Sequence, residues 1–229
     1  MITIKESLKK LLFLTEKNFQ PLIVDAGANV GDFTQMILEI LPGSKIIAFE
    51  PTPKTAIEYR MRLSDNINVS LFEYALSSKI SLSTFYINEP AGKTNSLLPR
   101  PINGKKYYSK KCETTEKIFV KTIDLDTFVL ENLNDSEIHL LKMDLQGGEI
   151  EALKGMTYLL KNQKIQIIVT EAMFIEHYES QPLLKDIWTF LSDFRYTFFD
   201  LVDVSWMNCD GQIRQGDAVF VSQKIRMSI

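Results

Sequence analysis

Short apolar runs alternate with amphipathic stretches through most of this sequence, and this alternation constrains the fold more than any other feature. In the amphipathic stretches apolar residues recur every three or four positions, which predicts helices over 32–42, 54–64, 149–160 and 183–194. The apolar runs predict strands buried on both faces, over 21–27, 45–51, 67–77, 138–148, 164–172, 196–204 and 217–222. Such strands, alternating with helices, form a parallel sheet covered by helices on both sides.

The last two predicted strands depart from this alternation. Only a short polar turn, NCDGQIRQGD, joins them, so there is no room for a crossover helix and they must be antiparallel neighbours. We therefore expect an α/β fold with a doubly wound, mostly parallel seven-stranded sheet and an antiparallel last strand. This Rossmann-like arrangement is the shape of a class I methyltransferase domain. Because no repeat or flexible linker divides the chain, residues 1–229 are expected to form a single domain.

Composition narrows the class of protein. The chain has 229 residues, 45% of them hydrophobic and 24% charged, which is ordinary for a soluble globular protein. A net charge of −3 argues against a nucleic-acid binder, and the two cysteines are expected to be reduced thiols. No apolar run reaches the ~20 residues of a membrane span, so we expect no membrane insertion.

The N-terminal segment, residues 1–20, lacks both a signal-peptide core and a small-residue cleavage site. Leu8, Leu11, Leu12 and Phe19 instead have helical spacing, which predicts an amphipathic helix docked on the domain. A cytoplasmic protein is the expectation that follows.

The turn after the first predicted strand lies in LIVDAGANVGDFT, Leu22–Thr34. A dinucleotide fingerprint, G-x-G-x-x-G, places glycine where the backbone approaches a pyrophosphate. Counted from Gly27, this chain has Asn29 and Asp32 at the second and third glycine positions. Asn29 would crowd the phosphate, and the Asp32 carboxylate would compete with it for the positive end of the helix. The turn therefore fits a phosphate ligand poorly.

S-adenosylmethionine avoids both conflicts, because it has no phosphate and carries a sulfonium cation and an ammonium group. Asp25, at the strand end, can accept from the ammonium group directly or through water. The turn residues Gly27, Asn29 and Gly31 are predicted to line the methionine part. The alternative for Asp32 is that it only caps the following helix.

Two further strand ends complete the predicted cofactor site. Glu50 follows the second strand, where an acidic side chain can take both ribose hydroxyls. Tyr74 and Ala75 follow the third, where an adenine edge would rest. NAD contains the same ribose, so Glu50 is informative only beside the poor phosphate fingerprint.

Six segments between Val24 and about Ala172 occur in a recognisable order. They are VDAGANVGDFT, AFEPTP, EYALSS, TNSLL, LLKMDLQGGEIEALKGM and IIVTEA. Together they resemble the FkbM-type methyltransferases, which implies an S-adenosylmethionine-dependent O-methyltransferase, typically acting on a sugar or natural-product hydroxyl. The family usually has Asp-x-Glu-Gly-x-Glu where this chain has Gln146 in the middle, with Asp144 and Glu149 in register. Any contribution of that glutamate to catalysis or to a metal is therefore in question here.

Methyl transfer requires alignment of acceptor oxygen, methyl group and sulfur, and a group that removes the hydroxyl proton. The candidates for catalytic base or acceptor alignment are Asp144, Glu149, Glu171 and His177, which follow strands at the ligand-binding edge. His177 is a candidate because a neutral imidazole can take a proton near pH 7, and its alternative is an ordinary surface histidine. Asp144 has a second role as a cofactor ligand, Glu149 could simply favour a helix start, and Glu171 could be solvated.

A divalent metal is a further option for the same edge, because Asp144 and Glu171 offer the oxygen ligands that hard cations prefer. Two carboxylates are too few to establish a metal site, so the metal stays unknown.

Residues 89–117 break the alternation with a polar, basic and proline-bearing segment. Loops of this length are usually functional or disordered, so the segment is either an acceptor-side lid or a solvated insertion. Asn95 and Ser96 match a short polar motif of the family and are predicted to line the acceptor pocket. A basic, aromatic group in the same segment could grip a phosphorylated or sugar acceptor, or be solvated: Lys105, Lys106, Tyr107, Tyr108, Lys110 and Lys111.

Two other functions stay open. An NAD-dependent oxidoreductase shares the sheet and Glu50, and a binding module could keep the cofactor pocket without turnover. A homo-oligomer is compatible with the sequence, which does not determine the acceptor or the methylated position.

Overall fold

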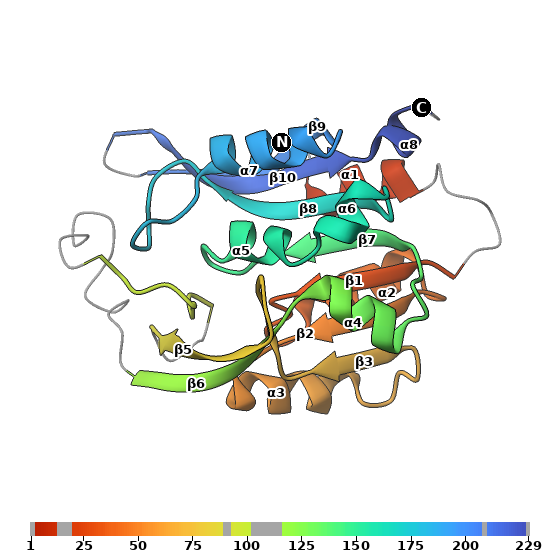
Figure 1. The fold of residues 1–229 in the computed structure, drawn as a ribbon, viewed down its shortest axis with the longest axis horizontal. Helices are drawn as coiled ribbons and strands as arrows, with labels where there is room; N and C mark the ends of the chain where they lie inside the picture. Colours follow the sequence, from red (N-terminus) through yellow and green to blue (C-terminus); the bar gives the residue numbers. More distant parts are fainter. Residues whose placement is uncertain (1–2, 13–19, 89–92, 102–115, 208–209, 228–229) are drawn as a thin grey trace.

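The computed structural model describes residues 3–12, 20–88, 93–101, 116–207 and 210–227. A seven-stranded sheet with helices on both faces forms its centre (Figure 1), and the strand order is β3-β2-β1-β7-β8-β10-β9. Strand β10 is antiparallel to β8 and β9, and the other neighbours are parallel, so the predicted sheet is confirmed. The strands are β1 (Leu22–Ala26), β2 (Lys45–Phe49), β3 (Val69–Phe72), β7 (Ile138–Met143), β8 (Ile165–Met173), β9 (Thr197–Trp206) and β10 (Ile213–Val221).

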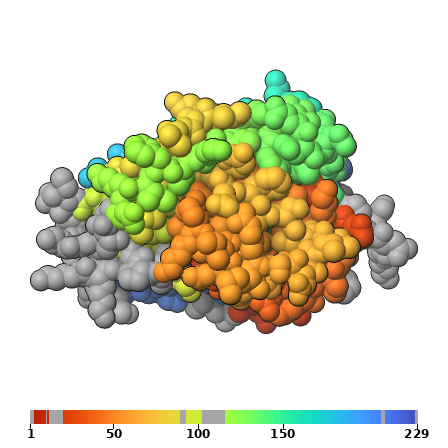
Figure 2. Space-filling view, turned by 90° about the horizontal axis from the view of Figure 1, so that it is seen from below, coloured from red at the N-terminus to blue at the C-terminus, as the bar shows by residue number. Residues whose placement is uncertain are grey.

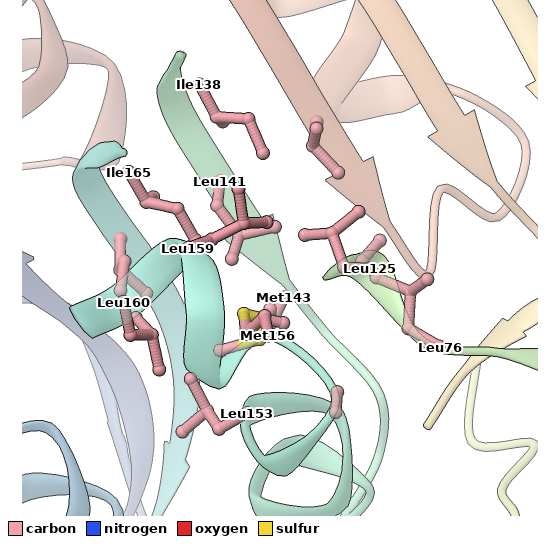
Figure 3. Close-up of a cluster of buried hydrophobic side chains, with 14 of the residues drawn as sticks. Leu76, Leu125, Ile138, Leu141, Met143, Leu153, Met156, Leu159, Leu160 and Ile165 are labelled. Carbon is pink, nitrogen blue, oxygen red and sulfur yellow. The ribbon is translucent and has the colours of Figure 1, made fainter. Parts of the chain in front are cut away.

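Apolar side chains on both faces of the sheet explain why its strands read as continuous apolar runs. Along β7, Leu141 belongs to one buried cluster and Leu140 to another on the opposite face. The first cluster lies under α4 (Leu125–Asn132), α5 (Glu149–Lys154), α6 (Thr157–Lys161) and α7 (Leu184–Asp193), and Figure 3 shows part of it, with Met156 and Leu159 beside β7. The second lies under α1 (Ile4–Leu12) and α2 (Asp32–Ile40), with α3 (Pro53–Leu63) over Ala48 nearby.

The N-terminal helix α1 packs on the second face through Leu8 and Leu11, which are buried. Its backbone is held to β9, because Ile4 N donates to Asp203 Oδ2 at 3.0 Å. Residues 13–19, which include Phe19 of the predicted docking helix, lie outside the described residues. In the ranges that the structure describes, no helix has the length and apolar character needed to cross a membrane.

The helix predicted over 149–160 is divided into α5 and α6 at Gly155. The backbone of Gly155 lies so close to the backbone of Ser77, a residue distant in the sequence, that an added Cβ would be 2.0 Å from the Ser77 carbonyl oxygen. The second helix then starts anew, because the Asp126 carboxylate accepts from Tyr158 N and Leu159 N at 2.8 and 3.0 Å. The single-helix prediction was wrong since periodicity does not reveal a close approach of distant backbone.

A second sheet, of three strands, was not predicted. Its order is β4-β6-β5, with β4 (Ala75–Leu76) parallel and β5 (Ser81–Ile87) antiparallel to β6 (Glu116–Ile123). The run predicted as one strand over 67–77 is therefore shared between the two sheets, and residues 116–117 of the predicted loop belong to β6. Figure 2 shows this sheet, in yellow to light green, beside the orange segment that contains α3. It adds a wall at the carboxyl edge of the main sheet, where Leu76 and Phe85 line a cavity.

Candidate active site

A cavity of about 280 Å³ opens at the carboxyl ends of β1, β2 and β7. Its size is close to the lower end of small-molecule sites, roughly 300–1,000 Å³. Of the predicted site residues, the cavity wall includes Gly27, Asn29, Glu50, Tyr74, Ala75, Asn95 and Asp144. The predicted residues Asp25, Gly31, Ser96, Glu149, Glu171 and His177 are not on this wall.

Gly27 brings the ends of β1 and β7 together. It has φ +77°, a left-handed conformation that favours glycine, and an added Cβ would lie 2.0 Å from the Asp144 carbonyl oxygen. Asp144 N donates to Ala26 O at 3.0 Å, which fixes the same junction. Glycine is therefore required here by contact between two strands, whether or not a ligand is bound.

Gly31 serves helix packing. Its φ is +89°, and an added Cβ would meet Leu63 Cδ1 at 2.6 Å and the Tyr59 ring at 3.1 Å. Asp32, the first residue of α2, makes no cap: the N-cap is Gly31, and the Asp32 carboxylate pairs with Arg62 Nη1 at 2.7 Å. The predicted cofactor contact of Gly31 and the capping alternative for Asp32 thus do not match the geometry.

Asp25 lies behind the cavity wall and is fully buried. Thr34 Oγ1 donates to its Oδ2 at 2.7 Å, and its Oδ1 is 4.0 Å from Lys142 Nζ. Burial raises the pKa of Asp25, although Lys142 and Thr34 counteract it. In this geometry Asp25 acts on the cavity through Lys142 and does not reach it directly.

Lys142 is a cavity residue that the sequence analysis missed. Its Nζ lies 3.4 Å from Asp144 Oδ2, and only 11% of the side chain is exposed. Burial alone would lower the pKa of Lys142, but the carboxylates of Asp144, Asp25 and Asp217 outweigh it and raise the pKa. A lysine inside the otherwise apolar run IHLLKM was the available signal, because a buried lysine requires acidic partners.

Glu50 is a buried carboxylate on the cavity wall. Its Oε1 accepts from Thr52 N at 2.8 Å and its Oε2 accepts from Asn29 N at 3.1 Å. Burial raises the pKa of Glu50, although these hydrogen bonds counteract it. Two backbone groups thus hold the carboxylate in one orientation beside Tyr74 and Ala75.

Asp144 and Glu171 are joined by Gln146. Gln146 Nε2 lies 2.7 Å from Asp144 Oδ1 and 2.8 Å from Glu171 Oε2. The other Glu171 oxygen accepts from Gln215 Nε2 at 2.8 Å. Burial and the neighbouring acids raise the pKa of Glu171 well above its usual value. Glu171 is therefore tied into the sheet edge behind Asp144 and does not face the cavity.

The metal option for Asp144 and Glu171 fits this geometry poorly. Their nearest oxygens both accept from the same amide nitrogen, whose hydrogens fill the space between them. Within the described residues, no group of three or more His, Cys, Asp or Glu side chains could hold a metal ion.

Glu149 stabilises the loop that carries Asp144. It lies at the start of α5 and is buried, and its Oε1 accepts from Leu145 N at 3.0 Å and from Gly147 N at 3.3 Å. Burial raises the pKa of Glu149 to about 7. The geometry fits a loop-stabilising role for Glu149 better than contact with an acceptor.

Glu149→Gln tests this role through pH. The folded-state pKa of about 7 exceeds the usual 4.5, so the folded protein binds this proton more tightly, and the associated stability is present below pH 4.5 and lost as pH rises to 7. Glutamine keeps an oxygen for both N–H groups and does not titrate. The variant's free energy of unfolding, relative to wild type, should rise by about 3 kcal/mol between pH 4.5 and 7.5 in denaturant titrations. Glu151→Gln, on the exposed side of α5, is the control, and a flat difference for Glu149→Gln would contradict the assignment.

His177 is buried away from the cavity. Its backbone N donates to Gln181 Oε1 at 2.7 Å and its carbonyl oxygen accepts from Arg100 Nη1 at 3.2 Å. Burial, together with the charges of Arg214 and Arg100, lowers the pKa of His177 to about 4. A base must take up a proton near pH 7, so this low pKa counts against His177 in that role, and His177 is not on the cavity wall.

The predicted acceptor residues differ in their exposure to the cavity. Asn95 lines it, and its Oδ1 accepts from Asn88 N at 3.0 Å. Ser96 is buried, and its Oγ donates to the Gln146 carbonyl oxygen at 2.7 Å, so it holds the loop after β7. The basic residues at 105–111 lie outside the described residues.

Comparison with known proteins assigns the chain to a family. Residues 25–198 match the model of the Methyltransferase FkbM domain. This chain belongs to the FkbM methyltransferase domain family. The match includes every predicted site residue, and the resemblance inferred from the six segments is thereby confirmed.

Three relatives of this FkbM-family chain are methyltransferases by name. Methyltransferase 1 of Beauveria bassiana is 32% identical over 145 residues, which are 58% of this chain and 57% of that protein. The 2-O-methyltransferase NoeI of Sinorhizobium fredii is 29% identical over 190 residues, 81% of this chain and 76% of that protein. The hexuronic acid methyltransferase AglP of Haloferax volcanii is 29% identical over 165 residues, 70% of this chain and 59% of that protein. The match thus spans little more than half the length of two of these relatives.

A solved structure agrees with the fold. The FkbM methyltransferase from Methylobacillus flagellatus superposes with a TM-score of 0.56 and 14% identity, over 88% of this chain and 43% of that one. At this identity the likeness concerns the fold alone.

Proposed function

We propose that this FkbM-family chain binds S-adenosylmethionine and transfers its methyl group to a hydroxyl of a small molecule, a sugar or a glycosylated natural product. When bound, the cofactor supplies a methyl group activated on a positively charged sulfur. The chain's own residues hold that cofactor, align the acceptor and exclude water.

The observation that carries this proposal is the hydrogen bonding of the turn after β1. All five backbone N–H groups from Gly27 to Gly31 are bonded within the chain: those of Gly27 and Ala28 donate to Phe49 O, that of Asn29 to Glu50 Oε2, that of Val30 to Asn29 Oδ1 and that of Gly31 to Ala28 O. A pyrophosphate needs such groups as donors. The turn therefore offers few free donors to the pyrophosphate of NAD, whereas a ligand without a pyrophosphate does not depend on them.

The charge of the wall supports a cationic ligand. Three carboxylates line the cavity, those of Asp32, Glu50 and Asp144, together with Lys93 and Lys142, and Asp25 lies behind them. Arg62 already pairs with Asp32, so three acids remain against two lysines and the net charge of the site is negative. In this assignment Glu50 takes the ribose hydroxyls and Asp144 faces the methionine part. Tyr74 and Ala75 lie where the adenine would rest.

The class of acceptor and the residues that bind it are assigned from the names of two relatives and from the residues that line the cavity. NoeI is named for 2-O-methylation and AglP for methylation of a hexuronic acid, which supports a carbohydrate hydroxyl. Asn95 borders the cavity beside the second sheet and offers an amide for a sugar hydroxyl. Asp144 is the carboxylate on this wall that can accept from the reacting hydroxyl and align its oxygen.

Calorimetry with S-adenosylmethionine, S-adenosylhomocysteine and NADH tests the cofactor assignment. We expect both adenosyl ligands to bind and NADH not to bind. Transfer from labelled S-adenosylmethionine is then measured with hexuronic acids and neutral glycosides as acceptors. Binding of NADH without binding of either adenosyl ligand would overturn the proposal in favour of an oxidoreductase.

Asp144→Asn separates charge from shape in the same assay. Asparagine keeps an oxygen for Gln146 Nε2 but removes the negative charge near the sulfonium. The affinity for S-adenosylmethionine should fall about tenfold, and that for neutral-sulfur S-adenosylhomocysteine less than about twofold. Asp32→Asn is the matched control, because the Asp32 charge is already paired with Arg62 and 68% of the side chain is exposed. Equal losses for both ligands would contradict a sulfonium beside Asp144.

A further inference from the structure

Gln146 has a defined amide orientation in the loop between β7 and α5. Its Nε2 is close to the carboxylates of Asp144 and Glu171, and its Oε1 lies 2.9 Å from the Tyr178 hydroxyl, which can donate to it. The reversed amide would set an oxygen against two carboxylates. Both amide hydrogens are therefore used, one on each acid.

The contacts of Gln146 belong to a longer chain of polar groups across the sheet edge. Lys142 faces one Asp144 oxygen and Gln146 the other, and Glu171 accepts from Gln146 and Gln215. Each of the four carboxylate oxygens thus has a nitrogen donor from β7, its loop or β10. This leaves Asp144 with its orientation fixed at the cavity wall.

The backbone also holds Gln146 in place. Its φ is +52°, in the left-handed region, and Ser96 Oγ donates to its carbonyl oxygen at 2.7 Å. Tyr178, which faces its Oε1, is buried and also lies 2.9 Å from the Thr94 carbonyl oxygen. The side chain is therefore fixed from three segments of the chain, as expected for a group whose geometry matters.

We propose that Gln146 is a positioning residue that joins Asp144 to Glu171 through its amide, so that Asp144 is held against the cavity without a divalent cation between the two acids. A cation between the two acids would need Asp144 Oδ1 and Glu171 Oε2 as ligands within roughly 2.0–2.6 Å. The amide nitrogen of Gln146 occupies that position. The proposal rests on the proposed function only in assigning Asp144 to the cofactor side.

Gln146→Glu is the decisive variant, because it keeps the shape and replaces two donors by a third carboxylate. Three acids then meet beside Lys142, whose single positive charge does not balance them, so the variant gains a place for a divalent cation. Wild type should bind no Mn²⁺ in a calorimetric or paramagnetic-resonance titration, whereas the variant should bind one. Without metal at pH 8 the variant's Tm should be about 5 °C lower than that of wild type, and 1 mM Mn²⁺ should restore most of the loss.

Gln181→Glu is the matched control for added charge. Gln181 lies in the loop after β8, is buried, and its Oε1 accepts from His177 N and Tyr178 N, so glutamate would keep both bonds without facing Asp144 or Glu171. Its Tm should not respond to Mn²⁺. One Mn²⁺ bound by wild type and lost in Asp144→Asn would overturn the proposal, and so would a folded Gln146→Glu variant that binds none.

The Gln146→Met variant distinguishes positioning of Asp144 from a merely structural role, because a structural role would not change the preference between the two adenosyl ligands. Methionine removes the donors without adding charge, so Asp144 remains but loses its fixed orientation. The preference for S-adenosylmethionine over S-adenosylhomocysteine should fall about fivefold, in the same direction as in Asp144→Asn. An unchanged preference in a folded variant would contradict positioning. If wild type binds neither adenosyl ligand, the proposed function fails, while the Mn²⁺ titration still decides the role of Gln146.

Discussion

Gly27→Ala is expected to lower the free energy of unfolding by about 3–5 kcal/mol and to abolish measurable binding of S-adenosylhomocysteine. Gly27 has φ +77°, and an added Cβ would lie 2.0 Å from the Asp144 carbonyl oxygen. Gly27 and the Asp144 carbonyl group belong to the backbone at the ends of the adjacent strands β1 and β7. Hydrogen bonds hold both ends in place, because Gly27 N donates to Phe49 O and Asp144 N to Ala26 O, each at 3.0 Å. Relief of the overlap must separate β1 from β7 where the cavity lies. Denaturant unfolding and calorimetry measure the two effects.

Gly211 provides a matched control for backbone conformation. Its φ of +76° is nearly the same, but an added Cβ would meet no described atom within 4 Å beyond its chain neighbours. Gly211→Ala should therefore cost only about 1 kcal/mol and leave ligand binding unchanged. If the two substitutions destabilise the protein equally, the left-handed conformation alone requires glycine at position 27, and the contact with Asp144 does not matter.

The glycines show what a motif can and cannot reveal. Sequence spacing correctly placed Gly27 at the cavity, but it attributed both Gly27 and Gly31 to the approach of a ligand. In the structure Gly27 makes room for the Asp144 carbonyl and Gly31 for Tyr59 and Leu63. A glycine-rich turn indicates that some atom approaches the backbone closely, and that atom is identified only once α3 and β7 are packed against the turn.

The elements of the fold also differ in whether the local sequence or contacts with distant segments determine them. The seven strands of the main sheet were predictable because each contains a short apolar run, although the edge strands β3 and β9 are only partly buried and not buried on both faces as predicted. The second sheet was not, because β5 (SLSTFYI) mixes polar and apolar residues and pairs with β6 across a long intervening segment. Pairing over such a separation depends on tertiary contacts that periodicity does not record.

The predicted acids do gather at one edge of the sheet, but some line the cavity and others lie buried behind its wall. Asp25, Glu50, Asp144 and Glu171 follow or end β1, β2, β7 and β8, as the strand pattern implies. Glu50 and Asp144 line the cavity, whereas Asp25 is buried behind Lys142 and Glu171 behind Gln146. Sequence spacing shows which strand end carries an acid. Whether that acid lines the cavity depends on the neighbouring side chains that lie between the acid and the cavity.

Glu50→Ala is expected to weaken binding of S-adenosylhomocysteine at least 100-fold, which corresponds to about 3 kcal/mol. In the proposed site the Glu50 carboxylate accepts from two ribose hydroxyls, and each hydrogen bond to a charged group contributes about 1.5 kcal/mol or more. The carboxylate also accepts from Asn29 N and Thr52 N, so its removal leaves two backbone donors without this acceptor. Calorimetry gives the affinity, and thermal unfolding shows whether the fold is retained.

Two companion variants distinguish lost ribose contacts from lost turn geometry. Glu50→Gln keeps the shape and one acceptor oxygen, so its loss of affinity should be intermediate, about tenfold. Glu73→Ala removes a carboxylate that pairs with Arg60 on the surface, with both side chains more than 40% exposed, and should leave affinity unchanged. Wild-type affinity in a folded Glu50→Ala variant would place the ribose elsewhere. Since NADH carries the same ribose, that result would count against both cofactors at this strand end, whereas the Asp144→Asn comparison tests the sulfonium alone.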